Sequence, residues 1–132
     1  KQIQAQDIDH LKNQELWLVE QLWAKYSRGH FGFTAQLKQW QSIGGRLFYE
    51  PDEYWRFAET YLQFSSRLQW RKWSWFPIPF LSQKWRSYDK LIFNLTAPQG
   101  HLPSFLYWEG CNITDALLAK IKQCISLFAE SN

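Results

Sequence analysis

Apolar side chains recur at spacings of three and four residues along the first part of the chain. The stripe consists of Ile8, Leu11, Leu18, Leu22 and Tyr26, and it is widened by Trp17, Val19 and Trp23. This spacing predicts one long helix or two abutting helices over about 7–27, with Asp7 as the N-cap. Gly29 has the position of a C-terminal stop, so we expect the helix to end near Tyr26 to Arg28.

Two more helices are predicted between residues 34 and 70. Thr34 offers its hydroxyl as the N-cap of a helix over about 35–43, which Gly44-Gly45 ends. Pro51 has one carboxylate before it and two after it, which is the composition of a helix start, because negative charge is stabilised at the positive end of the helix dipole. We expect the helix that follows to reach roughly to Trp70.

The C-terminal segment carries a further helical pattern, with apolar residues at Leu117, Leu118, Ile121, Cys124, Ile125 and Phe128. Asn112, Thr114 or Asp115 is the expected N-cap. Cys124 falls on the apolar face, where a packed thiol is the simplest role. Neither cysteine belongs to a CxxC or Cys/His spacing, so we expect reduced thiols rather than a zinc site or a disulfide.

The segment Thr96–Phe105 is predicted to be a shaped loop. Pro98, Gly100 and Pro103 exclude a regular helix or a central strand, because proline lacks an amide donor and glycine permits conformations that other residues avoid. Apolar residues surround His101, a mixture typical of a pocket wall, although a buried turn between two helices fits equally well. The preceding residues 87–95 suit either a short helix or a strand.

Residues 70–86 combine aromatic and basic side chains. They occur in Trp70-Arg71-Lys72-Trp73-Ser74-Trp75-Phe76 and again in Lys84-Trp85-Arg86, with two prolines between the two groups. The prolines exclude a helix there. Four interpretations stay open: an extended hairpin or arm that covers the core, a flap over an anionic aromatic ligand, a surface for single-stranded nucleic acid, and a membrane-interface contact.

Composition narrows the functional classes. A chain of 132 residues is one domain, and its 19% of aromatic residues exceeds what an ordinary core requires, so some should face a ligand or partner. The net charge of +3 suits an anionic ligand but is too small for a strong nucleic-acid footprint. The sequence has no nucleotide-binding, metalloprotease or serine-hydrolase motif, and no apolar run reaches the roughly 18 residues of a membrane span. We therefore expect a soluble binding module that is not an enzyme. Because the chain starts at Lys1 and has no methionine, we expect it to be a fragment or a processed product.

Several motifs follow one another along the chain. They are Leu22-Trp23, Gly29-His30-Phe31-Gly32-Phe33-Thr34-Ala35-Gln36, Leu68-Gln69-Trp70-Arg71, Tyr88-Asp89 and Phe93-Asn94-Leu95-Thr96-Ala97-Pro98-Gln99-Gly100-His101-Leu102-Pro103. In combination they resemble the genomes-uncoupled-four family, whose members bind porphyrins and stimulate magnesium chelatase in cyanobacteria and plastids. The resemblance covers about residues 8–125, and relative to that family Trp73 to Gln83 is interpreted as an insertion.

The resemblance implies an all-α fold. Residues 1–132 would form a single compact helical domain shaped like a cupped hand, with an apolar concave palm and an extra aromatic arm at about 72–84. The resemblance also implies a helix around Tyr88 to Phe93. It further implies a mobile loop from Ser104 to Cys111 that folds towards the ligand.

The ligand implied by the resemblance is a non-covalently bound tetrapyrrole, either a porphyrin (protoporphyrin IX or its magnesium form) or a bilin. Such a ligand requires aromatic walls and cations for its propionates. The expected wall is formed by Phe31, Phe33, Phe93, Leu102, Phe105 and Trp108, and the expected cations are Arg67, Arg71 or Arg86. His101 would hold the loop by hydrogen bonds, with axial ligation of a central metal as the alternative. Thioether attachment of a bilin to Cys111 is a weaker alternative.

The implied partner is the large subunit of magnesium chelatase or another tetrapyrrole-pathway enzyme, in the cytoplasm of a cyanobacterium or in the plastid stroma. We expect no nucleic-acid partner and no transmembrane segment, whereas a peripheral membrane contact stays open. The alternative function is a sensory or protein-interaction module that has lost pigment binding.

Overall fold

A computed structural model describes residues 5–73, 83–85, 90–104 and 110–129, and every structural statement below concerns these residues. In chain order the elements are α1 (Ala5–Asp9), α2 (Asn13–Ser27), α3 (Phe33–Ser42), the 3-10 turn η1 (Pro51–Glu53), α4 (Tyr54–Arg67), β1 (Arg71–Trp73), β2 (Gln83–Trp85) and α5 (Gly110–Phe128). The predicted all-α class is confirmed, since the only strands described are two short ones in a single ribbon.

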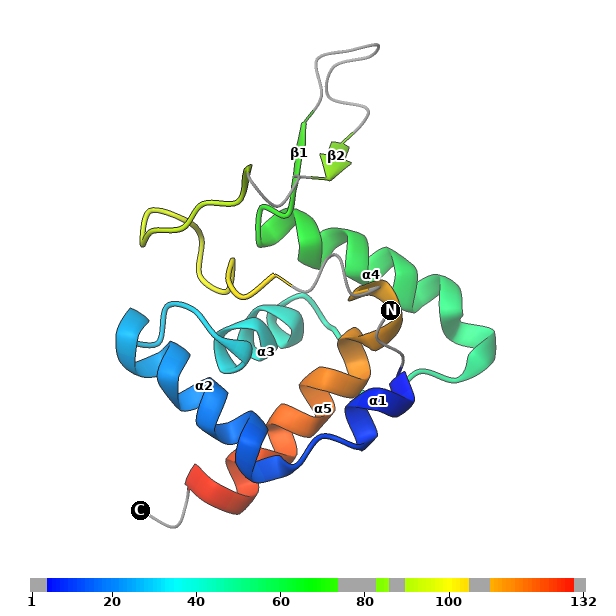
Figure 1. The fold of residues 1–132 in the computed structure, drawn as a ribbon. Helices are drawn as coiled ribbons and strands as arrows, with labels where there is room; N and C mark the ends of the chain where they lie inside the picture. The colour runs from blue at the N-terminus through cyan, green and yellow to red at the C-terminus, as the bar shows by residue number, and fades with distance from the viewer. Residues whose placement is uncertain (1–4, 74–82, 86–89, 105–109, 130–132) are drawn as a thin grey trace.

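Helix α5 lies at the centre of the domain and contacts each of the other four α-helices (Figure 1). Its predicted apolar residues are buried at Leu117, Leu118, Ile121 and Cys124. Burial raises the pKa of the Cys124 thiol above its ordinary value, which confirms the expected packed thiol. The predicted N-cap at 112–115 was wrong, because the helix already begins at Gly110. No helix in the described part of the chain is long and apolar enough to cross a membrane.

The N-terminal pattern corresponds to two helices, α1 and α2, rather than one. Asp7 lies inside α1, so its prediction as an N-cap was wrong. The predicted stop was right: α2 ends at Ser27, Arg28 adopts the left-handed conformation (φ 54°), and the Gly29 N–H donates to the carbonyl oxygen of Ala24 at 2.9 Å.

The apolar stripe that predicted α2 lies mostly on its outer face. Leu18, Leu22 and Tyr26 are 59%, 48% and 77% exposed, respectively. The inner face instead carries Leu16, Glu20 and Ser27, all buried. Glu20 and Ser27 are therefore buried on the face of α2 where apolar side chains are expected, and both bind the turn that follows the helix.

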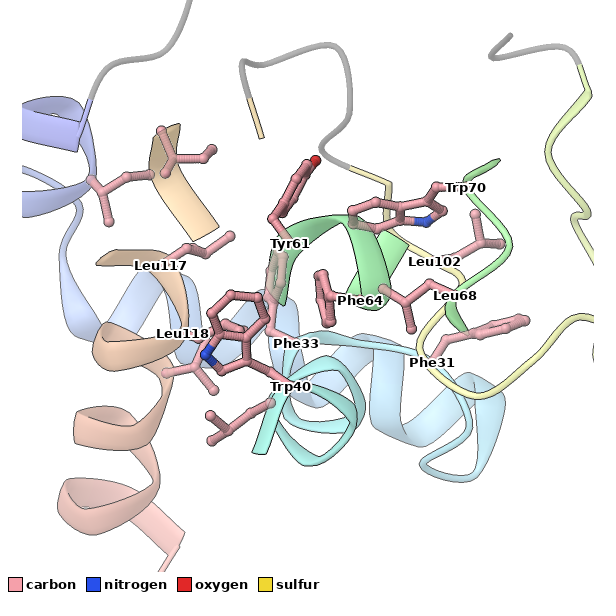
Figure 2. Close-up of a cluster of buried hydrophobic side chains, with 14 of the residues drawn as sticks. Phe31, Phe33, Trp40, Tyr61, Phe64, Leu68, Trp70, Leu102, Leu117 and Leu118 are labelled. Atoms are coloured by element: carbon pink, nitrogen blue, oxygen red, sulfur yellow. The ribbon is translucent and has the colours of Figure 1, made fainter. Parts of the chain in front are cut away.

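Helices α3 and α4 meet around the fully buried Trp40. Its ring lies edge-on to Phe64 of α4, with centroids 5.2 Å apart, and Phe64 lies edge-on to Trp70 at 5.6 Å (Figure 2). Aromatic pairs in this arrangement stabilise a core beyond the area that they bury. The aromatic surplus of the sequence is thus partly used inside the domain.

The boundaries of α3 and α4 test four predictions. The N-cap of α3 is Gly32, so the prediction of Thr34 was wrong, whereas the stop at Gly44-Gly45 was right. The start at Pro51 is confirmed by η1, where the side chains of Glu50 and Glu53 form a capping box. Helix α4 ends before Trp70, at Arg67, because Gln69 takes a left-handed conformation (φ 58°) that a helix cannot continue.

The described part of residues 70–86 forms the hairpin of the first interpretation, but its two strands do not cover the core as that interpretation expected. Strands β1 and β2 pair antiparallel, with Arg71 opposite Trp85 and Trp73 opposite Gln83. Figure 1 shows this ribbon projecting from the end of α4 away from the helices. Residues 74–82, including Trp75 and Phe76, lie outside the described residues.

The helix implied around Tyr88 to Phe93 is not present at Leu91–Phe93, which have no helical structure. The Ile92 N–H donates to a ring nitrogen of His101 at 2.9 Å instead of to a helical carbonyl. Tyr88 lies outside the described residues.

Candidate functional site

The Gly29–Phe33 turn and the Thr96–Ser104 loop lie side by side, although they are far apart in the sequence. The Gly32 N–H donates to the Leu102 carbonyl at 2.8 Å, and the Gly100 N–H donates to the His30 carbonyl at 2.8 Å. The His30 Nε2 donates to the Ala97 carbonyl oxygen at 2.6 Å. The two most distinctive sequence motifs therefore form one unit, called here the motif clamp.

Helix α3 supplies side-chain donors that hold the Thr96–Ser104 loop in place. The Nε2 atom of Gln36, which is fully buried, donates to the carbonyl oxygens of Gly100 at 3.1 Å and Pro103 at 2.6 Å. Gln39 donates to the carbonyl of Gln99 at 3.2 Å. Because the loop has no regular structure, these bonds satisfy carbonyl groups that would otherwise be buried without a donor. The loop is thus fixed in shape by α3.

The buried polar residues of α2 hold the turn in the same way. Ser27 Oγ accepts a hydrogen bond from the Phe31 N–H at 2.9 Å, and Glu20 Oε2 accepts one from the Phe33 N–H at 2.6 Å. Glu20 therefore caps α3 from a neighbouring helix, in place of the local cap expected from Thr34. The first N–H groups of a helix have no partner within it, which explains why α2 turns an acidic side chain inward.

Burial raises the pKa of Glu20 above its ordinary value, and hydrogen bonds with Thr34 and Phe33 oppose that rise. The carboxylate is only 2% exposed. Space for it exists because Gly32 has no side chain: a Cβ there would lie 2.6 Å from Glu20 Oε1, and the φ of +110° itself favours glycine.

Sequence reasoning did not identify Glu20 or Ser27. A signal was present, since Leu16, Glu20, Trp23 and Ser27 recur at spacings of four, three and four, the period of a second helical face. Because two of the four residues on that face are polar, it does not stand out as apolar. The stripe with Leu18 and Leu22 was therefore expected to be the buried face.

His101 is fully buried at the centre of the clamp, and both ring nitrogens are engaged. Nδ1 donates to the Leu68 carbonyl at 2.5 Å, while Nε2 accepts from the Ile92 N–H. The His101 carbonyl accepts from Trp70 Nε1 at 2.7 Å. The expectation that His101 holds the loop is confirmed, and a ring occupied at both nitrogens has no lone pair left for a metal.

A comparison with protein-family models decides the family. The GUN4-like model matches residues 1–121. The chain belongs to the GUN4-like family. No curated protein matched the chain. GUN4-like domains are tetrapyrrole-binding regulatory domains of a non-catalytic type, and the predicted resemblance is thereby confirmed.

The structure of this GUN4-like domain divides the predicted wall residues. Phe31, Phe33 and Leu102 belong to the clamp, and their side chains are buried in the core, as Figure 2 shows. Phe93 lies in the irregular segment that leads into the loop, and its side chain is 57% exposed. Phe105 and Trp108 lie outside the described residues. Their contact with a ligand stays a prediction.

The predicted cations also differ in position. Arg67 is exposed, and its Nε donates to Gln39 Oε1 at 2.6 Å, so its guanidinium lies beside the residue that holds the loop at Gln99. Arg71 is half-buried and donates to the Leu62 carbonyl at 3.1 Å, and burial lowers the pKa of its guanidinium. Arg86 lies outside the described residues. Of the two predicted cations that the structure describes, Arg67 is the exposed one, and its role with a carboxylate ligand stays a prediction.

A separate hollow of about 380 Å³ lies at the start of α4, at the opposite end of that helix from the clamp. It is lined by Tyr49, Glu50, Pro51, Tyr54, Phe57 and Asp115. Burial raises the pKa of Asp115. None of the predicted site residues lines this hollow, and within the described ranges no three His, Cys, Asp or Glu side chains are grouped to hold a metal.

Proposed function

We propose that this GUN4-like domain binds a porphyrin or a bilin non-covalently and acts as a regulator rather than as an enzyme. The observation that carries the proposal is the motif clamp, in which Gly32 and Leu102 are joined through their backbones. A clamp whose backbone is fixed by these hydrogen bonds gives neighbouring side chains a rigid base, which lowers the entropy cost of binding a large rigid ligand.

The chemistry beside the clamp suits a tetrapyrrole. The ligand is a wide apolar disc with anionic propionates, so it requires an aromatic face and a cation. Phe93 offers an exposed ring and Arg67 an exposed guanidinium, both next to the clamp. At about −0.3 kcal/mol per non-hydrogen atom, a ligand with roughly 42 such atoms has a ceiling near nanomolar affinity.

The finer proposals follow from the family. Protoporphyrin IX or its magnesium form is the proposed porphyrin, and the large subunit of magnesium chelatase or another tetrapyrrole-pathway enzyme is the proposed partner. The proposed setting is the cytoplasm of a cyanobacterium or the plastid stroma.

One observation favours the second candidate, a sensory or protein-interaction module without pigment. Phe31, Phe33 and Leu102 are buried, so three of the expected wall residues are already covered by protein. A pigment would then contact other side chains, or none.

Titration separates the two functions. The domain is mixed with protoporphyrin IX, its magnesium form and biliverdin, and quenching of tryptophan fluorescence is followed. We expect saturable quenching by at least one pigment, weakened by Phe93→Ala and by Arg67→Ala. The control variants Phe48→Ala and Arg56→Ala also remove exposed side chains, but away from the clamp, and should bind as wild type. If no pigment quenches saturably in the micromolar range, the pigment function fails and the interaction module is favoured.

A further inference from the structure

Helix α2 presents an exposed apolar surface, which we call the outer face of α2 and define by Leu18, Val19, Leu22 and Tyr26. All four side chains are at least 44% exposed, and they follow one side of the helix at spacings of three, four and seven residues. Figure 1 shows α2 at an edge of the helical body, with α5 on its inner side. A contiguous apolar helix face of this kind marks an interaction surface.

We propose that the outer face of α2 binds the same face of a second copy of this chain, with the two helices antiparallel. A two-fold axis level with residue 20 places Leu18 of one copy opposite Leu22 of the other, twice. Residues 18 and 22 then hold the d and a positions of a short coiled-coil seam, where antiparallel helices pair a with d.

The charges at the next layer agree with this register. The same axis places Glu15 opposite Lys25 of the second copy, and both side chains are exposed. Within one chain the two residues are separated by about 15 Å of helix, so they cannot form this pair themselves. The Lys25 ammonium instead lies over the ring of Tyr26, 5.4 Å from its centroid. Dimerisation would give both charges an oppositely charged neighbour.

The flanking positions fit as well. In this register Val19 lies against Val19 of the second copy, and Lys12 approaches the exposed Tyr26, a favourable pairing of a cation with an aromatic ring. A parallel arrangement would instead place Glu15 against Glu15 and Lys25 against Lys25, which is unfavourable. The sequence of the helix is therefore complementary to itself in the antiparallel direction.

A seam of one helix per chain is small, so the dimer should be weak and reversible. Sedimentation velocity of the complete 132-residue chain, from on the order of 10 µM to on the order of 1 mM, should show a shift from monomer to dimer. Leu22→Glu should abolish the shift. Leu62→Glu replaces a similarly exposed leucine of α4 and should leave it unchanged. A chain that stays monomeric throughout, or a dimer unaffected by Leu22→Glu, would overturn the proposal and leave the outer face to a different occupant.

Charge reversal tests the register. Glu15→Lys alone and Lys25→Glu alone each create two like-charge pairs per dimer and should weaken association about tenfold. An equimolar mixture of these two variants restores two opposite-charge pairs and should associate like wild type. Loss of folding in either variant, checked by circular dichroism, cannot produce such recovery on mixing. Failure of the mixture to recover while both variants stay folded would rule out the antiparallel register.

Discussion

A Cβ atom on Gly32 would lie 2.6 Å from Oε1 of Glu20 and 3.0 Å from the Cβ of Trp23. The turn after α2 is therefore fitted to α2 itself, at a residue whose φ of +110° already disfavours any side chain.

Gly32→Ala should lower the free energy of unfolding by about 3 kcal/mol, because strain in the backbone and displacement of the Glu20 carboxylate add together. Urea unfolding followed by circular dichroism measures it. Gly29→Ala is the control, since Gly29 also has a positive φ (+79°) but nothing lies within 4 Å of its Cβ position. Equal costs for the two variants would show that contact with Glu20 does not contribute.

Glu20 should make the stability of the domain depend on pH. Its pKa in the folded state is raised above the ordinary 4.5, so protonation favours the folded state. The stabilisation that Glu20 gives is complete below pH 4.5 and is lost as the pH rises through the raised pKa. The free energy of unfolding of wild type, measured relative to Glu20→Gln, should therefore fall as the pH rises across this window and then level off. A difference that rises with pH would contradict the burial of this carboxylate.

Removing the His101 ring should destabilise the domain strongly. His101→Ala leaves the Leu68 carbonyl and the Ile92 N–H without their partner, at a cost of about 2–4 kcal/mol. The exposed His10 is the control, and His10→Ala should cost almost nothing. Thermal unfolding of both variants checks this.

The same ring gives a spectroscopic prediction. Because both nitrogens of His101 are engaged, the Soret band of a bound zinc porphyrin should be the same for wild type and for His101→Gln, which keeps a donor and an acceptor. A shifted band in a folded His101→Gln variant would indicate axial ligation after all.

Gln36 should account for much of the order of the loop. Gln36→Ala removes the donor to the carbonyls of Gly100 and Pro103, so we expect a loss of about 1–3 kcal/mol. Gln41→Ala, on the exposed side of α3, serves as the control. Hydrogen exchange of the Gly100 amide, which donates to the His30 carbonyl, should accelerate in Gln36→Ala and not in the control.

Elements whose signals are local were predictable from the sequence. The stop after Ser27, the start at Pro51 and the apolar face of α5 depend on residues within a few positions, and the structure has them as expected. The orientation of α2 was not predictable from its stripe, because the inner face is determined by the N–H groups of Phe31 and Phe33, which lie beyond the end of the helix and require acceptors.

In the candidate site, too, local features were predictable from the sequence and features that depend on tertiary packing were not. Proline and glycine in the loop predicted an irregular backbone, and the order of the motifs predicted the family. What the motifs could not give is which side chains stay accessible: Phe31 and Phe93 are both aromatic residues of the motifs, yet one is buried and the other exposed. Accessibility depends on packing between helices, which single-chain patterns do not encode.

The imidazole of His101 binds Leu68, just before the ribbon of β1 and β2, and Ile92, just after it. One side chain thus holds together the two chain segments that flank the ribbon. Because both segments are hydrogen-bonded to the same imidazole, the chain leaves the helical body and returns to it at one place. We therefore expect the segment between β1 and β2 to be a position at which this fold can accept an insertion or a deletion while the helical core stays in place.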